Sequence, residues 1–364
     1  MSRSIVLVLA WCVALAGRLG AQVVRGEVVD SGTARPVVGV IVILLDDHGV
    51  RRAGALTDDA GRFAVRAPAP GRYTLRLDRI GYASSTSPPL ALGAGETVAR
   101  RLTASAIPIS LAALTVRGDD RCRVRPGEGE RSFALWREAR KVLEAANLSA
   151  ESGRVEARVR RYVRLLDPYT LAVRHEESAV TVARGERPFV AARSPEELAR
   201  DGYARRDERY TTYYAPDAEV LLSDPFAATH CFRALPPDDD HRGLVGLAFE
   251  PARKRKLPDV KGVLWLDART GALTRMEFRH TNLFPQVPPS KYGGELDFAR
   301  LPSGAWIVRR WWLRFPLFTG SAQAERPEGD MRELGIGKLP YSGFREEGGE
   351  VLTSRVTAAA DSLR

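Results

Sequence analysis

The chain has 364 residues, which is enough for two or three domains with sizeable hydrophobic cores. Hydrophobic residues make up 44% of it and charged residues 27%, a composition that is ordinary for a folded protein and argues against disorder. The formal net charge is +10, carried by 55 basic residues of which only six are Lys. We attribute this excess of Arg to genome composition, so the charge by itself does not predict a nucleic-acid partner.

The first 21 residues have the organisation of a secretory signal peptide. A positive start at Met1–Arg3 precedes an apolar run over residues 5–16, and small residues end the segment at Ala21. The apolar run is shorter than the roughly twenty residues that a membrane-spanning helix needs. We expect cleavage after Ala21, which leaves Gln22 first; a buried N-terminal helix is the alternative. Export predicts a periplasmic, outer-membrane-associated or cell-surface protein, with no nucleic-acid partner and no transmembrane segment after cleavage.

The segment that follows the predicted cleavage site reads as short strands separated by turns, the pattern of a β-sandwich. Predicted strands cover residues 24–28, 38–45, 51–56, 63–65 and 73–77. The second of these is a nearly continuous apolar run, as expected for a central strand that is buried on both faces. In the last one Tyr73, Leu75 and Leu77 alternate with polar residues, so we expect these side chains to point into the core. Gly61 should let the chain reverse before Phe63 enters that core.

Four stretches of this segment carry a resemblance to a known family: GEVVDSGTARPVVGVIVIL (26–44), TDDAGRFAV (57–65), PGRYTLRLDRIGY (70–82) and ETVARRLTASAIPISLAALTV (96–116). They resemble the carboxypeptidase regulatory-like domain family. The resemblance implies a transthyretin-like β-sandwich, a fold classed as carbohydrate-binding-like. Domains of this family often stand at the front of TonB-dependent outer-membrane receptors and other exported bacterial proteins. The resemblance agrees with export but implies no chemistry, since a fold does not carry a function.

Two cysteines remain after signal cleavage, Cys122 and Cys231. An even number in an oxidising compartment predicts one disulfide, which would close a loop of roughly 110 residues. The alternative is two buried thiols, because Cys also packs as a small hydrophobic residue. A catalytic role for Cys231 beside His230 is disfavoured, because neighbours in a strand point to opposite faces.

Helix signals follow the sandwich. We expect the sandwich to end at residue 116 and interpret residues 117–131, which are charged and contain Gly and Pro, as a linker. Ser132 is the expected cap of a helix over residues 133–146. The residues on one side of that helix are Trp136, Ala139, Leu143 and Ala146.

A shorter helix is predicted to begin at Ser194. Pro195 suits its first position, and Glu197 completes a capping box with Ser194.

The rest of residues 132–364 reads as antiparallel β-structure. Predicted strands cover residues 155–165, 170–184, 219–222, 262–267, 273–280, 295–298, 306–315 and 351–356. The fourth and fifth of these form one expected hairpin, and the sixth and seventh form another. The fold class is therefore mainly β: a transthyretin-like sandwich, followed by an α+β domain with one curved antiparallel sheet and one or two helices.

The first of these hairpins, GVLWLDARTGALTRMEFRH (262–280), is similar to strands of periplasmic lipoprotein-carrier domains, the LolA-like half-barrels. The similarity implies a sheet whose concave side shelters an acyl chain or another apolar ligand. The aromatic residues that would line that side are Trp265, Phe278, Trp306, Trp311 and Trp312. Ordinary core packing is the alternative interpretation, because aromatic side chains dominate cores in any case.

No catalytic, cofactor-binding or metal-binding pattern stands out in the sequence. The five histidines lack the local pairing typical of zinc sites, and the acidic run that ends at His241 lacks the ligand alternation of a calcium loop. No Walker loop, dinucleotide-binding glycine motif or nucleophile elbow is present. Paired carboxylates that act across a cleft remain open, because they can come from distant parts of a sequence.

One basic cluster is a candidate anion-binding loop. Its members are Arg253, Lys254, Arg255 and Lys256. Such a loop would suit lipid headgroups or acidic glycans, and an ordinary solvated loop is the alternative.

These observations predict an exported, non-enzymatic envelope protein that acts in binding or assembly and needs no cofactor. Envelope glycans, lipids and outer-membrane proteins are the candidate partners. A lipid or lipoprotein carrier and a hydrolase with dispersed catalytic residues are the alternatives. A deep apolar cavity lined by Trp and Phe would favour the carrier. A cleft with converging carboxylates, or a buried His–carboxylate pair, would favour the hydrolase.

Overall fold

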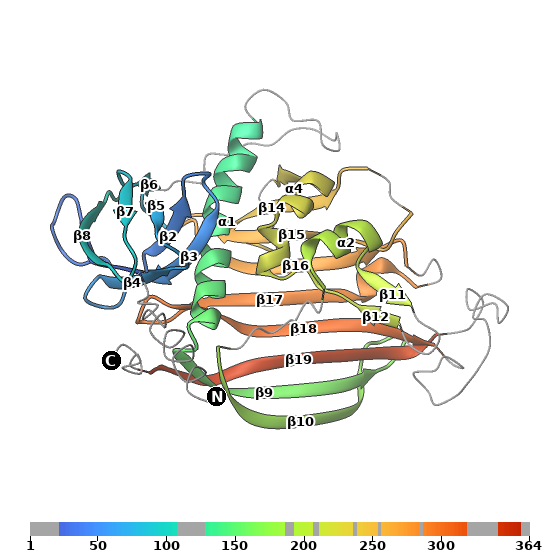
Figure 1. Ribbon diagram of the computed structural model, residues 1–364. Coiled ribbons are helices and arrows are strands. Elements are labelled where there is room, and N and C mark those ends of the chain that lie inside the picture. The colour runs from blue at the N-terminus through green and yellow to red at the C-terminus, as the bar shows by residue number, and fades with distance from the viewer. Residues whose placement is uncertain are drawn as a thin grey trace, which may run out of the picture. The chain divides into compact units, whose positions relative to one another are not determined.

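A computed structural model of the chain describes residues 22–107, 128–185, 193–206, 211–235, 239–253, 256–283, 287–318 and 341–357. The predicted signal peptide and most of the predicted linker lie outside these residues. The chain divides into two compact units, residues 1–107 and 108–364, which are described separately. Strands account for 54% and helices for 15% of the structure, which confirms the mainly β class (Figure 1).

The first unit is built from eight strands. They are β1 (Gln22–Asp30), β2 (Ile41–Asp46), β3 (Arg51–Leu56), β4 (Arg62–Ala67), β5 (Gly71–Asp78), β6 (Ser85–Thr86), β7 (Leu90–Leu92) and β8 (Thr97–Ala104). One sheet has the order β4-β1-β8, and the other has the order β3-β2-β5-β6 with β7 paired to β5. All neighbours are antiparallel except β1 and β8, which run parallel.

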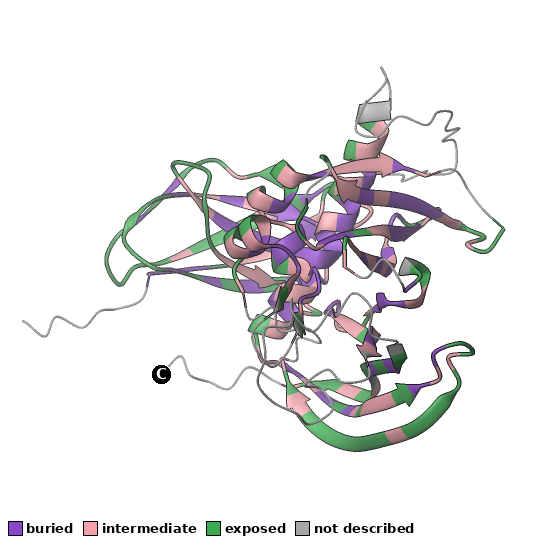
Figure 2. Cartoon of the chain, turned by 90° about the vertical axis from the view of Figure 1, so that its right-hand side faces the viewer, coloured by how far each residue is buried: buried purple, intermediate pink, exposed green. Residues whose placement is uncertain are grey.

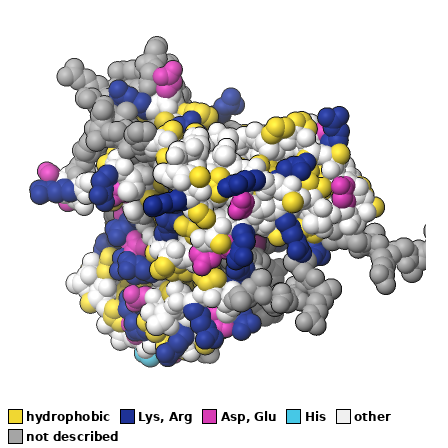
Figure 3. Space-filling view, turned by 90° about the vertical axis from the view of Figure 1, so that its left-hand side faces the viewer, with side chains coloured by type: hydrophobic (Ala, Val, Ile, Leu, Met, Phe, Trp, Pro, Cys, Tyr) yellow, Lys and Arg dark blue, Asp and Glu magenta, His cyan; other side chains and the backbone are white. Residues whose placement is uncertain are grey.

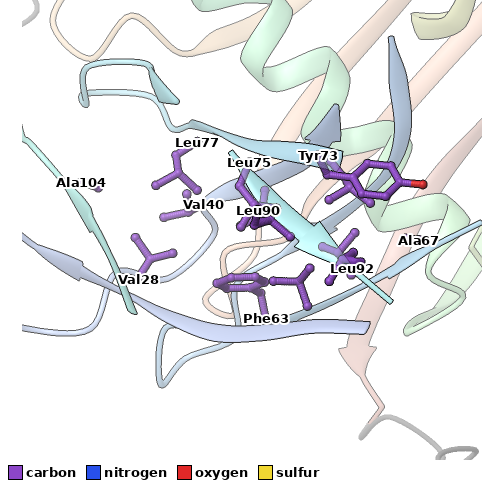
Figure 4. Packing of buried hydrophobic residues seen from close by; sticks show 14 of the residues in the cluster. Val28, Val40, Phe63, Ala67, Tyr73, Leu75, Leu77, Leu90, Leu92 and Ala104 are labelled. Atoms are coloured by element: carbon purple, nitrogen blue, oxygen red, sulfur yellow. The ribbon is translucent and has the colours of Figure 1, made fainter. Parts of the chain in front are cut away.

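Side chains from both sheets fill the space between them, as Figure 4 shows. Tyr73, Leu75 and Leu77 on β5 are buried in this core, as their alternation predicted, and Phe63 reaches it from β4. The Tyr73 hydroxyl donates a hydrogen bond to the Ala69 carbonyl at 2.7 Å, so its polar end is satisfied. The sandwich is therefore a closed structural core.

Gly61 holds the turn before β4. Its φ of 70° lies in the left-handed region, and a Cβ placed there would meet the Val28 carbonyl oxygen at 2.6 Å. Asp58 supports the same turn, since its Oδ1 accepts the backbone N–H of Ala60 and Arg62. Only glycine fits this position without a shift of the chain.

The second unit contains one nine-stranded antiparallel sheet with the order β10-β9-β19-β18-β17-β16-β15-β14-β13. Its strands are β9 (Val155–Leu166), β10 (Val173–Arg184), β13 (His230–Ala234), β14 (Leu244–Pro251), β15 (Asp259–Asp267), β16 (Leu273–Thr281), β17 (Gly293–Arg300), β18 (Trp306–Phe318) and β19 (Tyr341–Val356). The hairpins β15–β16 and β17–β18 form as predicted. A separate short ribbon pairs β11 (Ala204–Arg206) with β12 (Thr211–Tyr213).

The described residues of the second unit also form four α-helices: α1 (Glu128–Glu151), α2 (Pro195–Asp201), α3 (Ala218–Leu221) and α4 (Asp224–Thr229). A one-turn 3-10 helix covers Pro289–Lys291. The capping box of α2 is confirmed: the Glu197 N–H donates to Ser194 Oγ at 3.3 Å, and the Ser194 N–H donates to Glu197 Oε2 at 3.1 Å. Helix α1 extends beyond the predicted range at both ends. No helix of the described residues is long and apolar enough to cross a membrane.

The predicted strand over residues 219–222 is wrong, because most of that segment forms α3. Asp217 precedes the helix with an extended backbone, and its side chain accepts the Val220 N–H at 2.8 Å. An Asp at this position satisfies one of the unpaired N–H groups of a helical first turn. The local cap outweighs the strand preference of the apolar residues that follow it.

Helix α1 packs across one face of the nine-stranded sheet, in contact with β13 to β16 and β18 (Figure 1). We call this the helix face and the opposite one the outer face. The purple regions in Figure 2 mark the buried interior, whereas the edge strand β10, at the bottom of the view, is largely exposed and drawn green. The sheet is curved there, as Figure 2 also shows.

Candidate functional site

The main candidate site is an apolar cavity between α1 and the helix face of the sheet. Its volume is about 80 Å³, and it belongs to a recess of about 880 Å³ that includes open solvent. The 80 Å³ cavity is smaller than the ~300–1,000 Å³ of typical small-molecule sites, so by itself it accommodates only a short apolar segment. The side chains that form its apolar wall are Leu143, Ala146, Ala150, Val155, Ala157, Val159, Leu221, Met276, Leu296, Phe298, Trp306, Ile307, Val308, Trp311 and Val351.

A β-bulge places two of the three tryptophans of β18, Trp306 and Trp311, on this wall. Trp306 and Trp311 are five residues apart, so a regular strand would point them to opposite faces. The pairing of β17 with β18 shifts between Asp297 and Phe298, which leaves one extra residue in β18. The extra residue reverses the alternation, and both indoles line the cavity.

Small residues of α1 leave the space that the cavity occupies. Ala146 and Ala150 lie one turn apart on the helix and both line the cavity. Ser149 fixes the helix to the sheet, because its Oγ accepts the backbone N–H of Trp306 at 3.1 Å and donates to the Ala145 carbonyl at 2.8 Å. The helix is thus held at a distance from the sheet, and the alanine side chains leave part of the space between them empty.

A second, more open recess adjoins the cavity on the same face. It has a volume of about 460 Å³ and shares Trp311 with the cavity. The Trp311 indole lies over Gly349, where an added Cβ would come within 2.3 Å of the ring. Charged side chains surround this recess: Arg161 from β9, Glu177 from β10 and Glu347 from β19. Trp311 therefore stands between an apolar cavity and a polar recess.

The five aromatic residues expected to line the concave side do not gather at one place. Trp306 and Trp311 line the cavity. Phe278 is fully buried and does not line it. Trp265 and Trp312 lie on the outer face, where Trp265 stacks on His241 at 3.7 Å and Arg314 lies 4.7 Å above the Trp312 ring. Sequence reasoning missed Met276 and Phe298, although their alternation within β16 and β17 carried the signal.

The outer face is a network of ion pairs. Arg314 Nη2 lies 2.6 Å and Arg164 Nη1 lies 3.3 Å from the Glu346 carboxylate, which is almost fully buried. Burial, together with the charge of Glu346, raises the pKa of Tyr162 to about 12. Partners on neighbouring strands thus satisfy charged groups that the sheet surface shields from water. On the face of the molecule in Figure 3, basic and acidic side chains are likewise interspersed.

A buried histidine–carboxylate pair lies at the beginning of β13. His230 Nε2 is 3.1 Å from Asp259 Oδ1, and neither side chain is exposed. Thr229 Oγ1 lies 3.1 Å from His230 Nδ1, and the Phe226 ring stacks on the imidazole at 3.9 Å. Neither His230 nor Asp259 lines the cavity or the recess described above. The pair connects β13 with β15 inside the core of the second unit.

His280 is a second buried histidine on the helix face. Its Nε2 donates to the Tyr214 carbonyl at 2.9 Å. Complete burial lowers the pKa of His280 to about 4, because the charged form loses its hydration. The ring is therefore neutral at pH 7, as a structural member of the core would be.

The remaining predicted site residues are only partly described. Lys254 and Arg255 of the basic cluster lie outside the described residues, while Arg253 and Lys256 are exposed. Cys231 lies in β13, with its sulfur 3.6 Å from the Glu250 carbonyl oxygen, and Cys122 lies outside the described residues. The disulfide stays a prediction. In the described part of the chain, no group of three His, Cys, Asp or Glu side chains is placed to hold a metal ion.

Comparisons with known proteins identify the first unit. Among solved structures, the chain is similar to the minor pilin GBS52 of Streptococcus agalactiae, with 16% identity over 28% of this chain and 49% of that one and a TM-score of 0.21. It is also similar to the 5-hydroxyisourate hydrolase of Klebsiella pneumoniae, with 20% identity over 23% of this chain and 90% of that one and a TM-score of 0.19. Scores this low support no inference about function.

A third similar structure is the pilus 2b backbone protein of group B streptococcus, with 15% identity over 23% of this chain and 41% of that one and a TM-score of 0.20. The chain thus spans about half or less of the two pilus proteins. No curated protein sequence matches the chain. Residues 23–105, however, match the model of the carboxypeptidase regulatory-like domain. The first unit is therefore a carboxypeptidase regulatory-like domain with a transthyretin-like β-sandwich.

Proposed function

We propose that the protein is a non-enzymatic envelope protein whose second unit binds the acyl chain of an amphiphile. One observation carries the proposal: the cavity beneath α1 has an apolar wall that includes two indoles and the Phe298 ring. Burial of methylene groups against such a wall contributes about 0.8 kcal/mol each. The cavity itself admits only a short part of an acyl chain, so the rest of the acyl chain would occupy the larger recess to which the cavity belongs.

The neighbouring recess supports an amphiphile rather than a purely apolar ligand. Trp311 separates the apolar cavity from the recess that contains Arg161, Glu177 and Glu347. An acyl chain beneath α1 would place its polar end on the far side of this indole. Charged side chains of both signs at that end suit a polar headgroup.

The sandwich supplies the envelope context in this proposal. Residues 23–105 match the carboxypeptidase regulatory-like domain, and a fold contributes no catalytic group by itself, which suits a binding or assembly role. Export is part of the proposal. Mass analysis of the mature protein from its own host should find Gln22 as the first residue, and retention of Met1 would contradict export.

The hydrolase alternative has one supporting observation, the buried pair of His230 and Asp259. Both side chains are completely buried, and neither lines the cavity or the polar recess. A general base must come within hydrogen-bond reach of the proton that it removes. We therefore favour binding over hydrolysis.

The proposal is tested by titration with a fluorescent fatty acid, read by energy transfer from the cavity tryptophans. Ala146→Phe places a ring into the cavity and should weaken binding at least ~10-fold, because the ligand loses the apolar space that it would occupy. Ala227→Phe is the matched control, since Ala227 is an exposed residue of α4. It should bind as the unaltered protein does.

Thermal melts of both variants show whether either substitution changes the stability of the protein. If Ala146→Phe keeps the melting temperature and still binds normally, the cavity is not the binding site. If the unaltered protein binds no fatty acid and releases no lipid in native mass spectrometry, the proposed function is wrong.

A further inference from the structure

The strand β10 forms one edge of the nine-stranded sheet and is open on its outer side. It pairs with β9 along Val173–Arg184, and no strand of the described residues pairs with its other edge. At 12 residues it is long for an edge strand. Such an edge presents a row of backbone N–H and C=O groups that can pair with another strand.

The opposite edge of the sheet differs. There β13 has only five residues, and both α1 and α4 contact it. Short, covered edges are the usual protection against pairing between molecules. Within the described residues the strand β10 has neither protection: it is 12 residues long and mostly exposed, as the lower part of Figure 2 shows.

The middle of β10 is well suited to pairing. Residues 178–183 read SAVTVA, a stretch without charge, Pro or Gly and with three β-branched residues. Val180 and Val182 point to the outer face and are 49% and 64% exposed. Exposed valines of this kind in the centre of a free edge gain from a neighbouring strand.

One register joins two copies of β10 with complementary side chains. If Val180 lies opposite Val180 of a second copy in an antiparallel pair, Ser178 lies opposite Val182. Glu176 then lies opposite Arg184 at both ends of the pair, where the new contact would join the ion pairs that these residues already make with Arg164 and Glu156 of their own chain. The register centred on Ala179 instead sets Arg174 opposite Arg184, and like charges directly opposite each other destabilise a pair.

We propose that two copies of this chain associate through β10, antiparallel and centred on Val180, to form one sheet that is continuous across the dimer. The contact is self-complementary, as a two-fold interface requires. A single pair of edge strands buries little area, so the dimer is weak and depends on concentration. The proposal does not depend on the proposed binding function.

Sedimentation velocity of the mature, full chain over a range of concentrations tests the association. We expect a reversible monomer–dimer equilibrium. Val180→Lys sets two ammonium groups opposite each other and should raise the dissociation constant at least ~10-fold. Val50→Lys is the matched control, because Val50 is also 49% exposed but lies in the first unit. It should dimerise as the unaltered protein does.

Cysteine crosslinking tests the register. Cβ atoms directly opposite each other in an antiparallel pair are about 4.5–5.5 Å apart, so Val180→Cys should form a disulfide-linked dimer under mild oxidation. Val182→Cys should not, because its counterpart lies four residues away along the pair. Equal crosslinking of both variants overturns the register. A chain that stays monomeric at every concentration, or a dimer unaffected by Val180→Lys, overturns the proposal.

Discussion

The two units of the chain treat their interiors differently. In the sandwich, apolar side chains of two sheets meet and fill the space between them, so the interior is a closed core. In the second unit a helix with alanines at its contact surface covers a curved sheet, and a cavity remains between the two. This difference is the reason why ligand binding is proposed for the second unit.

A filled core is stable by itself, whereas a unit with an internal cavity forgoes part of its packing energy. The second unit should therefore depend more on other sources of stability. The largest expected effect on its stability comes from the predicted Cys122–Cys231 disulfide, which lies within that unit. Cys122→Ser should destabilise that unit by about 4–5 kcal/mol in the chain-entropy model. Denaturant melts of the second unit measure the change.

The control for this prediction is a direct chemical test for the disulfide. The bridge itself should appear as a linked peptide pair in non-reducing mass mapping. If both cysteines react as thiols under oxidising conditions, there is no bridge, and the second unit is stable without one.

Truncation of one buried leucine in each unit tests the difference in packing between the two interiors. Leu75 is completely buried in the sandwich, and Leu143 is equally buried but borders the cavity. We expect Leu75→Ala to cost about 4 kcal/mol and Leu143→Ala about 2 kcal/mol, because part of the surroundings of Leu143 is already empty.

Native-state hydrogen exchange measures these two costs separately, through the amides of β5 and of α1. Equal costs at the two positions would mean that the cavity closes in solution. In that case the contrast between the two interiors disappears.

The smallest expected effect is a difference in acid sensitivity. Burial lowers the pKa of His280 to about 4, below the unfolded value near 6.5. As the pH falls from 7 to 5, the unfolded chain therefore binds a proton that the folded chain does not. The stability of the second unit should fall by about 2 kcal/mol from this residue over that interval, and the loss should level off below pH 4.

The first unit gives the internal comparison, because its histidine, His48, is 80% exposed rather than buried. His280→Gln keeps a donor for the Tyr214 carbonyl but does not titrate in this range. Urea melts at pH 7 and pH 5 should show a smaller pH effect for this variant. The same pH dependence in both proteins would assign the acid sensitivity to another group.

The amino-acid sequence by itself determined much of the local structure. The alternation around Tyr73 and the turn at Gly61 fixed which side chains of β5 enter the core and where β4 begins. The same is true of the capping box at Ser194, because its donors and acceptors lie within four consecutive residues. These features depend on near neighbours, so single-sequence reasoning can find them.

Which aromatic residues meet at the cavity depends on the tertiary structure and cannot be predicted from the local sequence. The bulge in β18 reverses the alternation between Trp306 and Trp311, and its place depends on the pairing with β17. Trp312 points to the outer face because it directly follows Trp311 in β18, and Trp265 points there from β15, in register with Arg275. The open edge at β10 also became visible only from the strand order, since a sequence does not show which strand remains without a neighbour. Pairing between distant segments is set by the packing of the whole sheet, which a local pattern does not contain.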